Sequence, residues 1–289
     1  MFKNSKKYAL LFFTIFLLFF NIYLFAADWQ NSHRKFTFAM LDIGQGDALF
    51  IESPTGTQVL VDAGPPRKIL GPLSGVMPVF DRSLDAIIMT HPDQDHIGGF
   101  SEVLKNYEIG EVFEPGISDF SKTYQNLEKE IKDKKIPDIL ARRGMRIDLG
   151  GGARIDILFP DRDVSAWETN AGCIVAKLVY GNTSIMLTGD APMKTEQIIL
   201  SENSKAQLQS NILKVGHHGS RGSSSLAFVQ AVSPRYALIS VGKDNKYGHP
   251  HQETLDTLSK TGAQIFRTDQ LGTIVLKSDG QNTNFSFLK

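Results

Sequence analysis

A cluster of metal-capable side chains directly after a short apolar run is the feature that most limits what this chain can fold into. His91, Asp93, Asp95 and His96 lie within six residues, and the apolar run Ala86–Met89 comes immediately before them. Such a run is typical of a buried strand, so a strand ends by delivering imidazoles and carboxylates into a loop. These groups are costly to bring together unless a cation holds them. The sequence therefore predicts a metal site at a strand end, one that holds two ions.

Short apolar runs alternate with helical patterns from residue 36 to the carboxyl terminus. The predicted strands are Phe36–Leu41, Ala48–Glu52, Gln58–Val61, Leu84–Met89, Glu111–Phe113, Ile155–Phe159, Cys173–Tyr180, Thr183–Leu187, Ile212–Val215, Tyr236–Val241, Gln264–Arg267, Gly272–Leu276 and Asn284–Leu288. The predicted helices are Gly98–Asn106, Tyr124–Lys134, Met193–Ser201, Ser224–Val232 and Gln252–Lys260. Gly181-Asn182 predicts a hairpin with both turn residues at positive φ. The pattern predicts a layered α/β fold with mixed sheets in one compact domain over residues 36–289.

The amino-terminal segment predicts a membrane anchor or a targeting peptide. Lysines at positions 3, 6 and 7 precede an uncharged run of twenty residues, Tyr8 to Ala27, rich in Leu and Phe. That length is about what a helix needs to span a bilayer core. A signal peptide cleaved near Ala26-Ala27 is the alternative, although bulky Leu24 or Phe25 would then stand at its −3 position. We expect an anchor or signal peptide over 1–27, a linker over 28–35, and a catalytic domain on the extracytoplasmic side, because amino-terminal lysines stay in the cytoplasm.

Charge and cysteine content narrow the classes of function. Formal net charge is zero, but residues after position 27 hold 28 basic against 31 acidic side chains, a net of −3. This balance offers no large basic surface for gripping duplex DNA, which counts against a high-affinity nucleic-acid-binding protein. Cys173 is the only cysteine. A disulfide framework and a cysteine-based zinc site are therefore excluded, and any metal must be bound by His, Asp and Glu.

Three later motifs follow predicted strands in the same way as the first cluster. They are Thr188-Gly189-Asp190-Ala191, His217-His218-Gly219-Ser220 and Tyr247-Gly248-His249-Pro250-His251. Six of the seven histidines thus lie in loops at strand ends, and only His33 lies elsewhere. Strand ends of an α/β sheet are where ligand-binding and catalytic groups converge. We therefore expect these motifs to join the first cluster in one site.

In their order along the chain, these motifs resemble the metallo-β-lactamase superfamily. The resemblance rests on the HxDxDH run of residues 91–96, on Val61-Asp62-Ala63-Gly64 before it, and on the motifs around Asp190 and His217 after it. Residues 41–48, 214–220 and 247–251 are similar to the hydrolase domain of the ComEC/Rec2 competence proteins. The resemblance covers nearly all of residues 36–289. It implies an αβ/βα sandwich of two mixed sheets flanked by helices, with a two-metal site in the cleft between the sheets.

The same resemblance implies roles for single residues. His91 and Asp93 would bind one ion, Asp95 and His96 would bind the second, Asp190 would bridge the two, and His217 would complete the second ion's shell. Most superfamily members have histidines where this chain has Asp93 and Asn170. Replacing nitrogen by oxygen ligands favours harder ions such as Mn²⁺ without excluding Zn²⁺. The expected cofactors are therefore two divalent metal ions, Zn or Mn.

Two such ions suit the hydrolysis of a phosphodiester. Ions about 3.5–4 Å apart generate a nucleophile near neutral pH and stabilise charge on the attacked and leaving oxygens. The expected catalytic side chains are Asp95, Asp190 and His249, with His249 as the acid for the leaving group or as a phosphate contact. Backbone N–H groups of residues 219–224, with Ser220 and Arg221 beside them, are expected to form a phosphate cradle at a helix start.

Several of these side chains have structural alternatives. Asp190 could only cap the helix near Met193, and Asp62 is favoured as a partner of a turn or of a ligand histidine. Asn170 could be an ordinary turn residue, and His251 is expected at a helix start. His218 stays ambiguous, because neighbouring side chains seldom reach one ion together. Asp42 and Asp47 either shape a loop or line the site.

Three functions stay open from the sequence. The first is an outward-facing, metal-dependent phosphodiesterase or nuclease acting on single-stranded DNA, as the resemblance implies, with a strand path along Arg221, Lys243, Lys246 and Tyr247. The second is a hydrolase of another bond, such as a phosphocholine ester, a thioester or a lactam, because the fold alone does not decide chemistry. The third is a metal-stabilised accessory module in DNA uptake. The chain has a single hydrophobic segment, so pumping of DNA is not implied and a separate DNA-uptake channel stays open as a partner.

Overall fold

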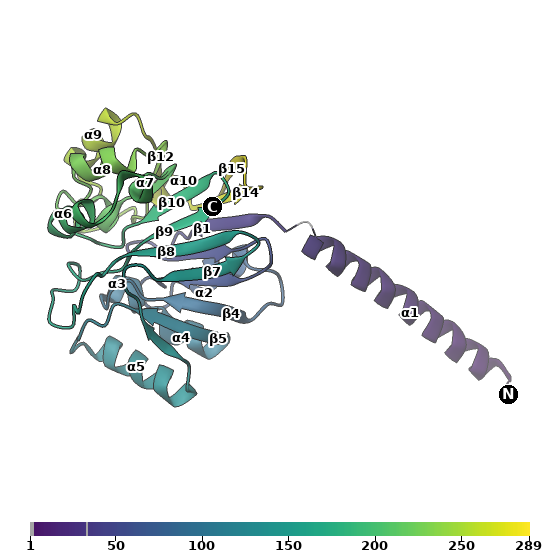
Figure 1. Ribbon diagram of the computed structural model, residues 1–289. Coiled ribbons are helices and arrows are strands. Elements are labelled where there is room, and N and C mark those ends of the chain that lie inside the picture. The colour runs from purple at the N-terminus through teal and green to yellow at the C-terminus, as the bar shows by residue number, and fades with distance from the viewer. Residues whose placement is uncertain (1–2, 33) are drawn as a thin grey trace.

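The computed structural model describes residues 3–32 and 34–289 (Figure 1). Its strands are β1 (Phe36–Met40), β2 (Leu49–Glu52), β3 (Gln58–Val61), β4 (Ser83–Ile88), β5 (Glu108–Glu114), β6 (Asp138–Leu140), β7 (Arg146–Gly150), β8 (Ala153–Phe159), β9 (Val175–Tyr180), β10 (Thr183–Leu187), β11 (Ile212–Lys214), β12 (Tyr236–Ile239), β13 (Gln264–Arg267), β14 (Thr273–Ser278) and β15 (Thr283–Leu288). Its helices are α1 (Lys3–Ser32), α2 (Leu70–Val76), α3 (Gln94–Ile97), α4 (Phe100–Asn106), α5 (Lys122–Lys134), α6 (Met193–Glu202), α7 (Lys205–Leu208), the 3₁₀ turn η1 (Gly216–Gly219), α8 (Leu226–Val232), α9 (Gln252–Lys260) and α10 (Thr268–Leu271).

The strands form two mixed sheets that pack face to face. The first sheet has eight strands in the order β15-β14-β1-β2-β3-β4-β5-β6, and the second has seven in the order β13-β12-β11-β10-β9-β8-β7. A core of apolar side chains such as Phe38, Ile155 and Leu178 fills the space between the sheets. Two further apolar clusters join the outer faces to helices, with α2, α4 and α5 on the first sheet and α6, α8 and α9 on the second (Figure 1). The predicted αβ/βα sandwich is therefore confirmed.

The parallel strands determine where polar loops collect. In the first sheet β3 and β4 run parallel, and in the second β10, β11 and β12 run parallel. Their central residues are buried, which is expected for strands covered on one side by the other sheet and on the other by helices. The loops after these strands therefore carry the polar residues of the fold's functional edge.

Most sequence-based elements are confirmed, with boundaries shifted by a few residues. Strands β6 and β7 were not predicted, because each is short and has charged residues at exposed positions. The hairpin between β9 and β10 is present, since Tyr180 pairs with Thr183. The predicted positive φ at both turn residues is wrong, because Gly181 alone has one, at 53°. A two-residue turn needs only its first residue in that region when it is of the II′ type.

Helix α1 precedes the sheets and leads away from them (Figure 1). It runs through the predicted anchor and into the predicted linker, ending at Ser32. Over residues 3–32 and 34–289, no helix combines the length and the apolar character required for crossing a membrane. The amino-terminal signal anchor stays a prediction from the sequence.

Candidate metal centre

The first cluster lies where β4 ends and a single helical turn begins. After β4, residues Met89 and Thr90 lead to His91, and Asp93 is the N-cap residue of α3. This short helix points His96 inward. Both imidazoles are fully buried, whereas the side chains of Asp93 and Asp95 are 37% and 36% exposed. The two histidines thus form the base of the site and the two carboxylates its open side.

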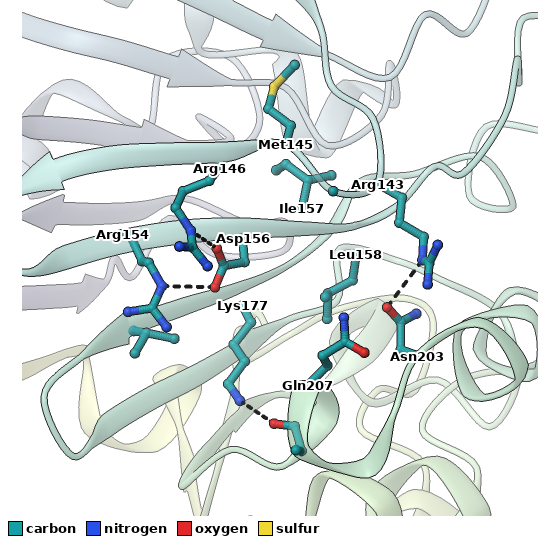
Figure 2. A pocket seen from close by; sticks show the side chains of 13 residues that line it. Arg143, Met145, Arg146, Arg154, Asp156, Ile157, Leu158, Lys177, Asn203 and Gln207 are labelled. Atoms are coloured by element: carbon teal, nitrogen blue, oxygen red, sulfur yellow. Dashed lines mark hydrogen bonds and ion pairs between the residues drawn. The ribbon is translucent and has the colours of Figure 1, made fainter.

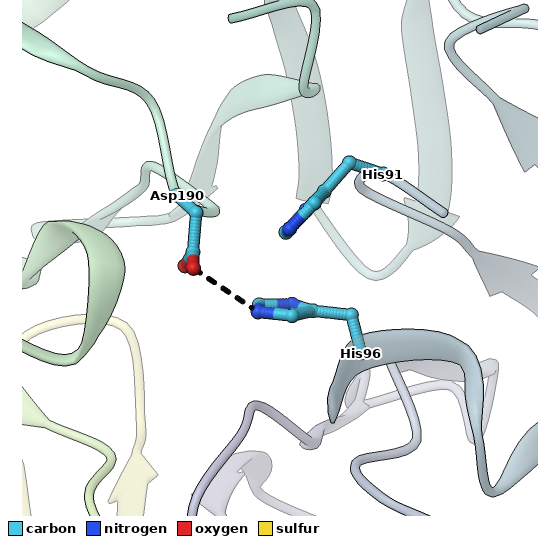
Figure 3. A group of neighbouring side chains, drawn as sticks. All are labelled: His91, His96 and Asp190. Carbon is cyan, nitrogen blue, oxygen red and sulfur yellow. Dashed lines mark ion pairs between the residues drawn. The ribbon is translucent and has the colours of Figure 1, made fainter. Parts of the chain in front are cut away.

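The second sheet supplies the facing side chains. Asp190 follows β10 after two residues, and η1 follows β11. Within η1 both His217 and His218 have left-handed backbone angles, with φ of 49° and 54°. This turn buries the side chain of His218, which is 1% exposed, and leaves that of His217 33% exposed. Figure 3 shows His91 and His96 converging on Asp190 from the first sheet.

Each buried imidazole is held through Nδ1. His91 Nδ1 lies 3.0 Å from Thr90 Oγ1, His96 Nδ1 lies 2.8 Å from Asp62 Oδ2, and His218 Nδ1 lies 3.0 Å from the Ser240 carbonyl oxygen. Such contacts fix the ring orientation and leave Nε2 free to bind a metal. The Nε2 atoms of all three histidines are buried without a hydrogen-bond partner among the described residues.

Two of these nitrogens and the Nε2 atom of the partly exposed His217 surround the carboxylate of Asp190. Its Oδ2 lies 3.4 Å from His96 Nε2, 3.5 Å from His218 Nε2 and 3.6 Å from His217 Nε2. Charge-assisted hydrogen bonds are shorter, about 2.7–2.9 Å. Donors bound to one ion at about 2.1 Å with tetrahedral angles lie about 3.4 Å apart. The spacing therefore matches the ligands of a cation better than it matches direct ion pairs.

The donors divide into two groups that share Asp190. Asp95 Oδ2 lies 3.4 Å from His218 Nε2, so Asp95, His96, His218 and Asp190 could surround one ion. On the other side, His91 Nε2 lies 3.7 Å from Asp93 Oδ2, and His91 groups with Asp190 and with His96. Each donor set is made of imidazole nitrogen and carboxylate oxygen, which suits Zn²⁺ or Mn²⁺. The residues present fit a two-metal site.

Neighbouring charges shift the pKa values of these groups. Burial, and then the positive charge of His96, hold the pKa of His91 well below its usual value. Burial opposes charging of His96 itself, but the carboxylates of Asp190 and Asp62 raise its pKa well above the usual value. Burial would also raise the pKa of Asp190, yet His218 and His96 lower it far below its usual range. The carboxylates thus attract positive charge at the position where a metal would replace the proton.

Asp62 and Asn170 lie beside the ligands. Asp62 accepts hydrogen bonds from the backbone N–H of Thr90 at 2.8 Å and from the Thr90 hydroxyl at 2.6 Å, besides holding His96. Asp62 therefore orients both the turn and a ligand histidine, which is the role that the sequence favoured for it. Asn170 Oδ1 is buried without a hydrogen-bond partner in the described chain, and the carbonyl oxygen of Asn170 accepts from the N–H of Cys173 at 3.4 Å.

The motif around Asp47 approaches the site from the first sheet. Asp42 Oδ1 accepts from the N–H of Gly44 at 3.3 Å and shapes the loop, whereas Asp47 is 1% exposed and lies 3.6 Å from His218 Nδ1. Gly46 has a φ of 128°, and a Cβ there would lie 2.1 Å from the carbonyl oxygen of Asp95. This glycine allows Asp47 to reach the metal ligands.

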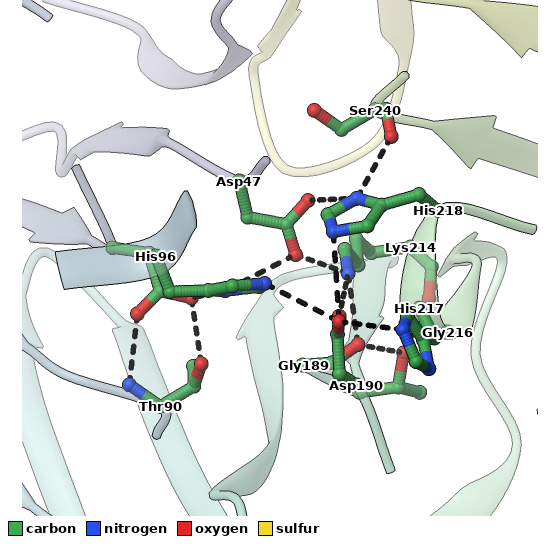
Figure 4. A network of polar contacts seen from close by, with 12 residues as sticks. Asp47, Thr90, His96, Gly189, Asp190, Lys214, Gly216, His217, His218 and Ser240 are labelled. Atoms are coloured by element: carbon green, nitrogen blue, oxygen red, sulfur yellow. Dashed lines mark hydrogen bonds and ion pairs between the residues drawn. The ribbon is translucent and has the colours of Figure 1, made fainter. Parts of the chain in front are cut away.

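Lys214 is a functional candidate that was not predicted from the sequence. It is the last residue of β11 and is 1% exposed, and its ammonium group contacts Asp47 Oδ2 (Figure 4). It also donates to the carbonyl oxygen of Gly189 at 2.8 Å. A lysine inside the apolar strand Ile212–Lys214 is the signal that could have identified it, because lysines are seldom fully buried without a partner.

The predicted phosphate cradle is wrong. Helix α8 begins at Leu226, and the carboxylate of Glu196 accepts hydrogen bonds from the N–H groups of Ser224 and Ser225, the latter at 2.9 Å. Ser220 Oγ accepts from the N–H of Gly222 at 3.3 Å. The backbone donors at this helix start are thus occupied by an acidic side chain from α6.

The open side of the metal centre is a cleft of about 170 Å³ lined by Gln45, Asp93, Asp95, Asp190, His217, His218, Tyr247 and His249. The ring of His249 lies 5.6 Å from that of His217 and 5.7 Å from that of Tyr247, measured between centroids. Burial, and then the nearby histidines 217 and 218, lower the pKa of His249 to about 4. His251 lies at the N-cap of α9, and its Nδ1 accepts from the N–H of Arg221 at 3.2 Å.

Comparisons with known proteins agree with this geometry. The sequence profile of the Metallo-beta-lactamase superfamily matches residues 41–243. ComE operon protein 3 of Bacillus subtilis is 33% identical over 86% of this chain and 34% of its own length. Recombination protein 2 of Haemophilus influenzae is 30% identical over 91% of this chain and 31% of its own length. The chain therefore spans about a third of the length of these curated relatives.

Solved structures share the fold at low sequence identity. The metallo hydrolase Igni18 from Ignicoccus hospitalis superposes with a TM-score of 0.51 at 14% identity, over 88% of this chain and 100% of its own. CmlA, a diiron β-hydroxylase from Streptomyces venezuelae, superposes with a TM-score of 0.53 at 12% identity, over 85% of this chain and 54% of its own. At such identities the similarity shows the fold alone.

Proposed function

Because the chain belongs to the metallo-beta-lactamase superfamily, we propose that it is a two-metal hydrolase that cleaves phosphodiester bonds, with single-stranded DNA as its substrate. The observation that supports hydrolysis most directly is the set of three buried, unpartnered imidazole nitrogens around Asp190. Orphaned polar atoms of this kind cost about 1–3 kcal/mol each unless a ligand satisfies them. A site that keeps three of them in one place is built to bind cations.

The ligand assignment follows from position in the cleft. Asp95, His96, His218 and Asp190 would hold one ion, and His91, Asp93 and Asp190 the other. When bound, two divalent ions supply Lewis-acid chemistry that activates water and offsets negative charge on a phosphate. His218 replaces His217 in this assignment, because its Nε2 is buried between Asp95 and Asp190. His217 lies at the rim, where it can contact a substrate oxygen.

The mouth of the cleft favours a nucleic-acid strand over a compact ester. Tyr247 is 54% exposed at the entrance, and the ammonium group of Lys246 lies 5.4 Å from the centre of its ring. Exposed aromatic rings stack on bases, and adjacent cations contact the phosphate backbone. The names of the relatives, which include a recombination protein and, in Neisseria gonorrhoeae, a competence protein, point to the same class of substrate.

Metal-dependent turnover of the purified chain tests the proposal. With Mn²⁺ or Zn²⁺, we expect cleavage of single-stranded DNA and of bis-p-nitrophenyl phosphate, and slower cleavage of duplex DNA. Asp190→Asn should lower turnover more than about 100-fold, since one carboxylate serves both ions. Asp256→Asn, an exposed carboxylate on α9, is the matched control and should change nothing. If protein that is shown to bind metal cleaves none of the phosphodiesters, this result would contradict the proposal and favour an ester or lactam substrate.

The proposal also includes an extracytoplasmic location for the catalytic domain, supported by the three lysines before the apolar run of residues 8–27. A phosphatase fused to the carboxyl terminus should then be active outside the cytoplasm, and inactivity there would contradict this orientation.

A further inference from the structure

A second cavity lies on the outer face of the second sheet. Its volume is about 630 Å³, and it is formed by residues of β7, β8 and β9 and by the α6–α7 segment (Figure 2). Cavities that bind small ligands or parts of larger ones measure about 300–1,000 Å³. None of the residues that line it also lines the metal cleft. It is therefore a separate feature of the molecule.

Positive charge is concentrated in this cavity although residues after position 27 are net acidic. Four cationic side chains line it, Arg143, Arg146, Arg154 and Lys177, against the single carboxylate of Asp156. Strand alternation causes this arrangement. Along β8 the residues Ile155 and Ile157 face the core, so Arg154 and Asp156 face outward. The cross-strand partners of Asp156 are Arg146 on β7 and Lys177 on β9.

The two arginines present free donors to the cavity. Asp156 accepts from Arg146 Nε at 2.6 Å and from Arg154 Nε at 3.1 Å, so one carboxylate anchors both guanidinium groups (Figure 2). In the described part of the chain, the Nη atoms of Arg146 and Arg154 form no hydrogen bond. Planar guanidinium groups with free N–H donors match the oxygen pairs of a phosphate. Two of them side by side suit successive or bridging phosphate oxygens.

The other two cations are bound to the protein. Lys177 Nζ donates to the carbonyl oxygens of Ala206 at 3.2 Å and Gln209 at 2.6 Å. Arg143 donates to Asn203 Oδ1 at 3.3 Å and lies 4.0 Å from the carboxylate of Glu202. These contacts hold the α6–α7 side of the cavity in place. The guanidinium groups that are free to bind an anion are therefore those of Arg146 and Arg154.

Apolar side chains lie beside the arginines. Met145, Leu158 and Val179 line the same cavity, and Figure 2 shows Met145 above Ile157 and Leu158 next to the polar groups. A nucleotide joins an anionic phosphate to a flat base that packs on apolar or guanidinium surfaces. We propose that this cavity binds the phosphate backbone of a nucleic-acid strand outside the active site. The proposal rests on the proposed function, which makes such a strand the substrate.

Equilibrium binding separates this site from a general charge effect. A fluorescein-labelled oligodeoxythymidine strand is titrated in EDTA with the full chain, with Arg146→Gln/Arg154→Gln, and with the control Lys129→Gln/Lys132→Gln on α5, which removes the same charge. We expect the arginine variant to lose at least about tenfold in affinity, with a log–log salt slope shallower by about 0.7 for each phosphate that the protein no longer neutralises. The control should bind like the wild type. The variant Arg146→Lys/Arg154→Lys keeps both positive charges but lacks the planar guanidinium groups, so it should recover only part of the affinity.

The outcomes distinguish this proposal from the proposed function. Thermal unfolding should show that all variants fold, and hydrolysis of bis-p-nitrophenyl phosphate should be equal in the arginine variant and the wild type. Wild-type DNA affinity in the Gln variant, or the same loss in the α5 control, would overturn the proposal. So would arginine-dependent binding to phosphatidylglycerol vesicles without DNA binding. Arginine-dependent DNA binding by a chain that cleaves no phosphodiester would support this site and contradict the proposed function.

Discussion

Lys214 forms a buried ion pair with Asp47 inside the metal centre, and its ammonium group also lies 3.6 Å from Asp190 Oδ1 (Figure 4). Burial opposes the charge on Lys214, but the two carboxylates outweigh burial and raise its pKa. The lysine therefore stays protonated and compensates part of the negative charge that the ligand carboxylates bring into the cleft. It also holds Asp190 in position through the carbonyl oxygen of Gly189, at 2.8 Å.

Replacing this lysine should destabilise the protein most when metal is removed. Lys214→Met leaves Asp47 and Asp190 without their internal cation, and breaking a buried pair costs about 3–5 kcal/mol. Divalent ions bind only the folded site, so they should restore much of the stability. Chemical denaturation in EDTA and in Mn²⁺ measures both values. The exposed control Lys129→Met should lose nothing, and an equal loss for Lys214→Met with and without metal would contradict this role.

The two adjacent histidines of η1 should differ in metal binding. His218→Ala removes a buried donor between Asp95 and Asp190, whereas His217→Ala removes a rim side chain that is 33% exposed. We expect the first variant to bind one metal equivalent fewer and the second to keep both. Metal content by mass spectrometry after dialysis gives the answer. Loss of an equivalent in His217→Ala but not in His218→Ala would reverse the assignment.

His249 should contribute a neutral N–H contact rather than an acidic proton. Burial and the neighbouring histidines lower its pKa to about 4, so the ring is neutral at pH 7. His249→Ala should then slow activated and unactivated phosphodiesters equally, by about 10–100-fold, the value of a hydrogen bond to a charged group. His249→Gln keeps an N–H donor and should recover part of the loss. A selective loss on poor leaving groups in steady-state kinetics would restore the acid role.

The sequence predicted those parts of the site that depend on strand ends and spacing. His91 and Asp190 each follow an apolar run by a few residues, and His96 lies five residues beyond His91. The carboxyl ends of the strands are where ligand-binding groups converge in α/β sheets. The choice between His217 and His218 could not be predicted, because it depends on left-handed backbone angles within η1. Lys214 was missed because it lies inside a strand rather than after one.

The prediction of a phosphate cradle was wrong for a related reason. A serine-rich segment before a helix is indeed a common anion site, but here Glu196, 28 residues earlier in sequence than Ser224, occupies the backbone donors. Contacts made across such a separation depend on the tertiary fold and leave no local pattern. The basic cavity of β7–β9 is another example, since β7 was not predicted and the pairing of Arg146 with Asp156 follows from its register.

Glu114 should make the fold less stable as the pH rises. It is 8% exposed at the end of β5 and accepts a hydrogen bond from the hydroxyl of Tyr124 at 3.1 Å. Burial, and then the negative charges of Asp138 and Glu128, raise its pKa from 4.5 to about 7. Between pH 4.5 and about pH 7, the carboxyl group of Glu114 is mostly deprotonated in the unfolded chain and mostly protonated in the folded chain. The free energy of unfolding therefore falls as the pH rises through this range.

Glu114→Gln should remove this dependence. The neutral amide still accepts from Tyr124, so the variant should match the wild type near pH 4.5 and exceed it by about 1–3 kcal/mol at pH 8, since each pKa unit corresponds to about 1.4 kcal/mol. Urea denaturation of both proteins at the two pH values measures the difference, in which titrations common to both cancel. Glu253→Gln, an exposed change on α9, should show no such difference. A gain for Glu114→Gln of the same size at both pH values would mean that packing, not ionisation, is responsible.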